Sequence, residues 1–171
     1  MTKRAMAAET AAPTMSAPSA QAAIARQWLI CRVAQEEYLL EVPLIKEIIR
    51  VPELTAVPRA PQWLKGICSL RGIVIAVIDI GCRLGLGARQ VTPKSRVVVL
   101  TTEKGLGGVL VDGVQGLIRL EPSQVNPPPP LLAAPHRELL RGIVHEEGRT
   151  YILLDPERIV TISGAITGPS C

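Results

Sequence analysis

Two stretches of sixteen residues decide the fold: LKGICSLRGIVIAVID at 64–79 and LRGIVHEEGRTYILLD at 140–155. In each, a Leu-basic-Gly-Ile segment is followed by an apolar run and by an aspartate thirteen positions after the glycine. A second match precedes them in the same order: Val42, Ile45, Ile48 and Ile49 recur as Val111, Val114, Leu117 and Ile118 at a constant offset of 69. This repeat predicts an internal duplication, and two similar small β-barrels are the simplest architecture that follows from it.

Short apolar runs separated by turn signals fill the chain from Gln27 onward. Ile, Val and Leu supply the apolar residues, because Phe is absent. This pattern predicts an all-β protein rather than alternating strands and helices. The expected strands are 28–33, 38–42, 47–51, 67–70, 73–79, 96–101, 107–112, 116–120, 142–145 and 150–154.

Helical turns are expected at 43–46 and at 80–86. A short C-terminal helix is expected after Asp155, because the sequence Asp-Pro-Glu has the chemistry of a helix start. The proline run 127–130 cannot join a ladder and is expected to form a polyproline connector.

The domain boundaries follow from composition. Residues 1–26 are rich in Ala, Ser, Thr and Pro and are expected to form a disordered arm; the folded domain is expected at 27–162, followed by a flexible tail at 163–171. No apolar run approaches the roughly 20 residues needed to cross a bilayer. The cysteines show no C-x-x-C spacing, which favours thiols in a reducing compartment, the cytoplasm.

The composition argues against several kinds of chemistry. The net charge of +4 is modest, and the four aromatic residues are scattered, so neither a dense basic face nor a stacking platform for nucleic acid is expected. The glycine clusters at 81–87 and 105–108 match no phosphate-binding motif. No nucleophile, base and oxyanion donor are expected to converge, so the sequence predicts a protein without catalytic activity, cofactor or metal.

Four blocks carry a resemblance to a known family: 38–50 (YLLEVPLIKEIIR), 57–72 (VPRAPQWLKGICSLRG), 75–79 (IAVID) and 109–114 (VLVDGV). In this order and spacing they resemble the signature blocks of CheW. The resemblance covers roughly residues 27–162. It implies two interlocked SH3-like five-stranded β-barrels.

The resemblance also implies a function. CheW proteins are non-catalytic adaptors that bridge the cytoplasmic tips of methyl-accepting chemoreceptors to the regulatory domain of a CheA-type histidine kinase. They assemble into rings in receptor arrays at the inner face of the membrane, without inserting into it. The chain departs from the family pattern at Leu39-Leu40, where a small residue is usual, and at Cys68-Ser69, where Asn commonly precedes the Leu-Arg-Gly segment.

Seven residues are expected to bind the receptor. Glu47 and Arg71 carry opposite charges near a helical turn and a hairpin, and the resemblance places the matching residues where the receptor binds; a weak surface ion pair is the structural alternative. A groove between the barrels is expected to accept a receptor helix, with core packing as the alternative for each residue. Its expected lining is Val42, Ile45, Ile48, Val114 and Leu117.

Kinase binding is expected at Gly66, which matches a family position tied to kinase contact, and at its neighbours Lys65 and Ile67. For Gly66 the main expectation is nevertheless structural, a turn or a close approach of backbone. Asn126 and Leu131 flank the proline run where some relatives carry Arg and an aromatic residue at a ring contact. They are the expected ring contact in this chain.

Two other functions stay open. The same scaffold could serve a chemosensory system that controls twitching, biofilm formation or a second messenger, with a different receptor and kinase. Alternatively, the barrels could bind a small ligand or an oligonucleotide. Salt-sensitive binding to nucleic acid without any kinase interaction would favour the second alternative.

Overall fold

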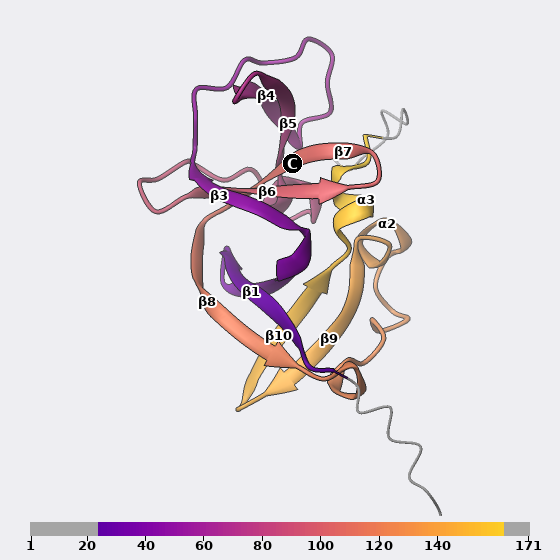
Figure 1. Ribbon diagram of the computed structural model, residues 1–171. Helices are drawn as coiled ribbons and strands as arrows, with labels where there is room; N and C mark the ends of the chain where they lie inside the picture. Colours follow the sequence, from indigo (N-terminus) through magenta and orange to yellow (C-terminus); the bar gives the residue numbers. More distant parts are fainter. Residues whose placement is uncertain (1–23, 163–171) are drawn as a thin grey trace, which may run out of the picture.

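The computed structural model describes residues 24–162, which form two five-stranded sheets (Figure 1). Sheet A has the strand order β8 (Gly113–Leu120), β1 (Arg26–Val33), β2 (Glu36–Glu41), β10 (Arg149–Leu154) and β9 (Leu140–Glu146). Sheet B has the order β3 (Ile45–Arg50), β6 (Arg96–Thr102), β7 (Gly105–Val111), β5 (Ile73–Asp79) and β4 (Leu64–Leu70). The predicted all-β fold of two SH3-like barrels is confirmed, and each of the ten expected strands is present.

The two barrels interlock because the chain crosses between them twice. Strands β1 and β2 belong to sheet A, β3 to β7 belong to sheet B, and β8 to β10 return to sheet A. The two strand orders correspond position by position, with β3 matching β8 at one end and β4 matching β9 at the other. The duplication predicted from the sequence is therefore a duplication of structure.

The duplication extends to the irregularities of the ladders. Lys46 is the extra residue of a bulge in β3, and Gln115 is the extra residue of a bulge in β8. Lys65 in β4 and Arg141 in β9 occupy a second matched pair of bulges, each directly before a glycine. These bulges explain why four strands start earlier than predicted: β3 begins at Ile45 rather than 47, β4 at Leu64 rather than 67, β8 at Gly113 rather than 116, and β9 at Leu140 rather than 142. An extra residue breaks the period-2 pattern that the sequence reading relied on.

Residues 24–162 form a hydrophobic core of three parts. One cluster lies within each sheet: Trp28, Leu39 and Leu153 belong to that of sheet A, and Val97 and Val99 to that of sheet B. The third cluster, the interbarrel core, draws residues from both sheets and from the short helices. Its strand residues are Leu29, Cys31, Val33, Tyr38, Leu40, Ile78, Val98, Leu100, Val109, Val111 and Leu154.

Two-sided burial explains the uninterrupted apolar runs of the sequence. Along β6, Val97 and Val99 face the core of sheet B, whereas Val98 and Leu100 face the interbarrel core. All four side chains are fully buried. A strand that packs on both faces needs apolar residues at every position rather than at alternate ones.

The short helices sit where the strands change direction. A 3-10 turn, η1 (Val42–Leu44), leads into β3, and α1 (Ile80–Arg83) and α3 (Pro156–Val160) follow β5 and β10. Asp155 caps α3 by accepting hydrogen bonds from the backbone N–H groups of Glu157 and Arg158, as predicted. Two further elements, η2 (Pro122–Gln124) and α2 (Ala134–Arg137), were not predicted; the proline run 127–130 lies between them and belongs to no strand.

Some expectations concern residues beyond this description. Positions 1–23 of the expected arm and the expected tail at 163–171 lie outside the described residues, and β1 begins at Arg26, inside the range assigned to the arm. Cys31 and Cys68 are free thiols, as expected. Within residues 24–162, no helix is long and apolar enough to span a bilayer.

Candidate functional site: two docking edges and a tryptophan pocket

The predicted ion pair between Glu47 and Arg71 is present. Nη2 of Arg71, in the turn between β4 and β5, lies 3.1 Å from Oε2 of Glu47 on β3. Because β3 and β4 are the two terminal strands of sheet B, the pair links its two edges. The Arg71 side chain is 78% exposed and that of Glu47 is 21% exposed, so the guanidinium remains available to a partner.

The five predicted groove residues form what we call the apolar edge: Val42, Ile45, Ile48, Val114 and Leu117. Val42, Ile45 and Val114 are half-buried and pack against the interbarrel core. Ile48 and Leu117 are 41% and 55% exposed. Core packing, the structural alternative, therefore describes the first three residues, and the last two remain open to solvent.

The strand registers show which way Ile48 and Leu117 face. Ile48 pairs with Val98, and Leu117 pairs with Leu29. Cross-strand partners in an antiparallel ladder point to the same face, and Val98 and Leu29 both belong to the interbarrel core. The two exposed residues therefore continue the interbarrel face outward on the terminal strands of the two sheets.

The matched bulges create this arrangement. Residues three apart on a regular strand point to opposite faces, but the extra residue Lys46 brings Ile45 and Ile48 to the same face of β3. Gln115 does the same for Val114 and Leu117 on β8. Glu47 pairs with Val99 of the sheet B core, so it points away from the apolar edge. The predicted receptor site thus divides into an apolar edge and, on the opposite face of β3, an ion pair.

The predicted kinase-binding residues lie together on β4. Ile67 is half-buried, and its backbone pairs with Thr55 in both directions at 2.9 Å. A Cβ atom on Gly66 would lie 2.7 Å from the carbonyl oxygen of Thr55, which confirms the close approach of backbone expected there. Lys65, the bulge residue, lies 3.8 Å from Oδ2 of Asp79 and donates to the carbonyl oxygen of Arg89. The ammonium of Lys65 is thus already engaged within the protein.

The matching place in sheet A holds the predicted ring-contact residue Asn126. Its backbone pairs with Ile143, as that of Thr55 pairs with Ile67. Asn126 is exposed, and Leu131 beyond the proline run is 97% exposed. A Cβ atom on Gly142 would lie 2.7 Å from the carbonyl oxygen of Asn126, so Gly142 repeats the role of Gly66.

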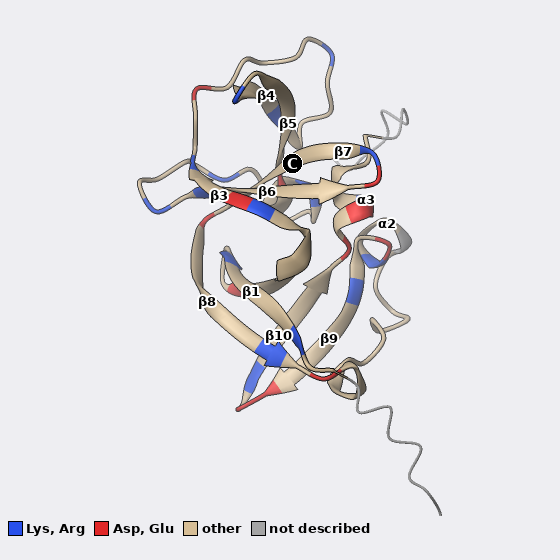
Figure 2. Ribbon diagram, viewed as in Figure 1, with Lys and Arg blue, Asp and Glu red and all other residues tan. Residues whose placement is uncertain are grey.

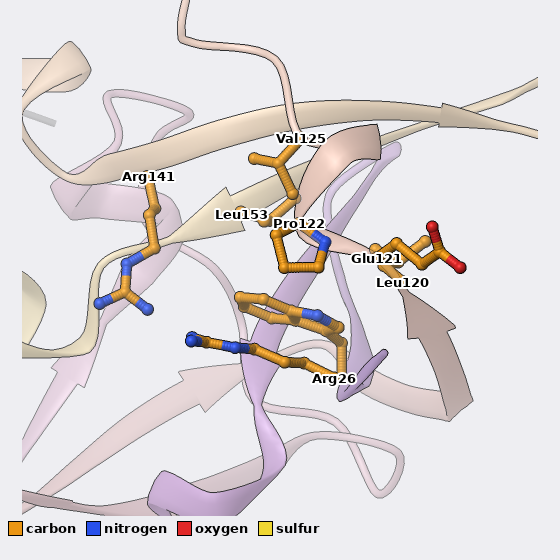
Figure 3. A pocket seen from close by; sticks show the side chains of 8 residues that line it. Arg26, Leu120, Glu121, Pro122, Val125, Arg141 and Leu153 are labelled. Atoms are coloured by element: carbon orange, nitrogen blue, oxygen red, sulfur yellow. The ribbon is translucent and has the colours of Figure 1, made fainter. Parts of the chain in front are cut away.

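A cavity of about 300 Å³ opens beside this segment (Figure 3). Trp28, only 3% exposed, lies in its lining together with apolar residues of β8, β10 and the η2 region. Arg26 and Arg141 reach toward the same side of the pocket, and the carboxylate of Glu121 points away from it. Glu41 joins the two arginines, with its oxygens 3.0 Å from Arg26 and 2.7 Å from Arg141.

The sequence reading did not find this pocket, although it contained a usable signal. Arg141 occupies the repeat position of Lys65, and Trp28 is one of two tryptophans in the chain. What the sequence could not supply is the meeting of strands β1, β8 and β9 from distant parts of the chain.

Burial raises the pKa of three acidic groups among the described residues. Burial raises the pKa of the Cys31 thiol to about 12 and also raises the pKa of Cys68, so both stay protonated at neutral pH. Burial raises the pKa of Tyr38 as well, and its hydrogen bond to Glu36 acts in the same direction. No group of three or more potential metal ligands occurs within residues 24–162.

Two interlocked five-stranded β-barrels define a class of small all-β proteins. The CheW-like domain model matches residues 27–163, which is most of the chain. The chain therefore belongs to the CheW-like family. As a member, it is an adaptor of bacterial chemotaxis-type signal transduction that couples receptors to a CheA-type kinase.

Known proteins of the same kind are similar along most of their length. The chain is 27% identical to the chemotaxis protein CheW of Rhizobium meliloti (strain 1021) over 134 residues, 78% of this chain and 86% of that protein. It is 31% identical to protein FrzA of Myxococcus xanthus over 130 residues, 76% of this chain and 81% of that protein. The crystal structure of the scaffolding protein TtCheW from Thermoanaerobacter tengcongensis superposes with a TM-score of 0.75 at 26% identity, covering 82% of this chain and 91% of that one.

Proposed function

We propose that this chain couples chemoreceptors to a histidine kinase through two separate surfaces and performs no chemistry itself. The apolar edge receives a receptor helix, and the surface around Lys65, Gly66 and Ile67 contacts the regulatory domain of the kinase. The observation that carries the proposal is the exposure of Ile48 and Leu117 on the outward continuation of the interbarrel face.

A helix suits the apolar edge. An amphipathic helix docks by laying apolar side chains, three or four residues apart, against a hydrophobic groove. Ile48 and Leu117 stand on the terminal strands of two different sheets, so a single helix can contact both barrels at once. The partner would in this way hold the two barrels in a fixed relation.

The receptor contact is tested with the signalling-tip fragment of a chemoreceptor from the same genome. Ile48→Asp and Leu117→Asp are expected to weaken binding by at least about tenfold, because each would place an unpaired carboxylate in an apolar contact. Leu131→Asp is the matched control, since Leu131 is a more exposed apolar residue outside the edge. Titration calorimetry measures the affinities, and unchanged binding by Leu117→Asp would contradict the proposal.

Arg71 contributes to binding of the same receptor fragment through its positive charge. Arg71→Glu is expected to weaken receptor capture without changing the melting temperature, because exposed ion pairs contribute about 1 kcal/mol or less to stability. The swapped variant Glu47→Arg/Arg71→Glu separates two roles of Arg71. It should bind as weakly as Arg71→Glu if the partner reads the charge at position 71; full recovery would show that only the internal pair matters.

The kinase contact needs a variant that leaves the backbone intact. Replacement of Gly66 forces a Cβ atom against the carbonyl of Thr55, so a loss of kinase control would also reflect a disturbed fold. Ile67→Asp avoids this, because Ile67 points away from the sheet B core that its neighbour Cys68 contacts. We expect Ile67→Asp to lose binding to the kinase regulatory domain while still binding the receptor fragment. Leu117→Asp should show the reverse pattern.

Assembly relies on many such contacts. Asn126 and Leu131 supply the ring contact next to the tryptophan pocket, in the cytoplasm beneath the receptor array. Contacts of moderate affinity are sufficient there, because an array raises the effective concentration of each site. Leu131→Asp is expected to reduce co-assembly with receptor and kinase on vesicles while leaving both pairwise affinities unchanged; normal assembly would remove Leu131 from the contact.

A further inference from the structure

Two adjoining cavities next to the apolar edge are lined by cations. The larger, of about 790 Å³, is lined by Arg32, Arg89, Lys94 and Asp112 among others. The smaller, of about 320 Å³, shares Arg32, Lys94 and Asp112 and adds Arg96 and Val114. We call these five charged residues with their cavities the basic recess. Figure 2 shows the corresponding blue segments on the loop that enters β6 and beside it.

The recess carries uncompensated positive charge. Asp112 is the one carboxylate among its described lining residues, and it is already bound by Arg89 at 3.2 Å and by the backbone N–H of Ala34 at 2.8 Å. Arg96 donates to the carbonyl oxygens of Pro93 and Ser95, neither of which is charged. The side chains of Arg32 and Lys94 form no hydrogen bond or ion pair with any described residue. Arg32, Lys94 and Arg96 therefore form no ion pair with a described carboxylate; the nearest acidic residue to Arg32 across the ladder, Glu37, is already paired with Arg149.

The strand register adds a fourth cation in an unfavourable position. Arg50 at the end of β3 stands directly opposite Arg96 on β6, and like charges in direct cross-strand positions destabilise a sheet. The repeat does not require this pair, because the matching positions of sheet A are Arg119 and Gln27. The fold does not need the repulsive pair of Arg50 and Arg96, since sheet A has no such pair at the matching positions. We take the pair to serve an anionic ligand.

The surroundings indicate what kind of anion. Val114 belongs to both the recess and the apolar edge, so an occupant of the edge extends toward the cations. None of the described residues that line the two cavities is aromatic, so they offer no platform for stacked bases. The cations line hollows rather than a flat face, which suits side chains that protrude from a helix.

We propose that the basic recess binds aspartate or glutamate side chains of the helical partner that lies on the apolar edge. Arg32, Lys94 and Arg96 supply the charge-assisted hydrogen bonds, and Arg50 adds long-range attraction. This inference rests on the proposed receptor contact. It adds that the partner helix carries carboxylates beyond its apolar stripe. The recess thereby selects the register of the helix along the edge.

The test uses two synthetic helical peptides with the same leucine stripe, one bearing glutamates and the other glutamines at the end of the stripe. At low ionic strength the protein is expected to bind the glutamate peptide at least about tenfold more tightly, with the difference shrinking as salt rises. Arg32→Glu/Lys94→Glu should abolish the preference and leave binding of the glutamine peptide unchanged. The control Arg59→Glu/Arg137→Glu makes the same change of net charge at exposed sites outside the recess and should keep the preference.

The outcomes separate this proposal from the receptor assignment. Equal affinity for the two peptides, or loss of the preference in the Arg59/Arg137 control, overturns the basic recess as a carboxylate site. So does equally tight, recess-dependent binding of a single-stranded oligonucleotide or of anionic lipid vesicles. If the glutamate preference holds but the receptor fragment does not bind the unmodified protein, the recess stands and the receptor assignment fails.

Discussion

At the scale of single residues, Arg50 and Arg96 show a charge arrangement that costs the fold some stability. They face each other across β3 and β6 without a carboxylate between them. Arg50→Glu would convert the repulsive pair into an attractive one and is expected to raise the free energy of unfolding by about 0.2–1 kcal/mol. The same variant should bind the glutamate peptide less tightly. Urea unfolding and peptide titration check the two effects, and a less stable variant would contradict the argument.

Cys31 links burial to the pH dependence of stability. Its folded-state pKa of about 12 lies above the ordinary value of 9.0, because the buried thiolate would lose its hydration. The unfolded state then releases this proton at a lower pH than the folded state, so the free energy of unfolding falls as pH rises from about 9 toward 12. Cys31→Ala should flatten this fall relative to Cys68→Ala, as measured by urea unfolding between pH 8 and 10. An identical pH profile for the two variants would contradict it.

Individual site residues differed in how far the sequence could predict them. The Glu47–Arg71 pair was predicted and is present, because a hairpin turn and a strand start have recognisable signals. The basic recess was not predicted, because Arg32, Lys94 and Arg96 come together only through the registers of β1, β6 and β8. Whether the predicted residues bind receptor and kinase stays a prediction that the variants above test.

At the scale of elements, two aspartates cap matching helices with different degrees of burial. Asp79 is 1% exposed and accepts from the backbone of Cys82 and of Arg89, with Lys65 beside it. Asp155, by contrast, caps α3 at a more exposed place.

Replacement of either aspartate should lower the free energy of unfolding, and the loss should be larger where more hydrogen-bond donors lose their acceptor. Asp155→Ala is expected to cost about 0.5–2 kcal/mol, the usual range for a helix cap. Asp79→Ala should cost more stability, because it also leaves the half-buried ammonium of Lys65 and the backbone N–H of Arg89 without their acceptor. Thermal unfolding of both variants gives the order, and a larger loss for Asp155→Ala would refute it.

Strands were easier to predict than their exact starts or the extra helices. Apolar runs bounded by turns marked all ten strands, but period 2 cannot reveal a bulge, so the starts of β3, β4, β8 and β9 were placed too late. The α2 turn sits in a segment of prolines and alanines with no helical pattern of its own. Its position depends on packing that only the folded chain provides.

At the scale of the whole molecule, the interbarrel core makes the two barrels one unit. It contains buried residues from both sheets and from α1 and α3. Trp28 reports on the core of sheet A, and Trp63 packs against the interbarrel core.

We expect both tryptophans to report a single unfolding transition. Trp28→Phe leaves Trp63 as the reporter, and Trp63→Phe leaves Trp28. Because the barrels share a core, the two fluorescence midpoints should differ from the circular-dichroism midpoint of the same variant by no more than the error of measurement. Separate transitions within one variant would mean that the barrels unfold independently.

The exchange of strands between the barrels also affects synthesis on the ribosome. β1 and β2 emerge first, but their neighbours β8 and β10 are encoded more than seventy residues later. Sheet B can form while the β1–β2 hairpin of the nascent chain still lacks both neighbouring strands. A hairpin with two unpaired edges is prone to wrong pairing. A premature stop within the last third of the gene would therefore leave the opening hairpin, and not merely the missing end, without a place to fold.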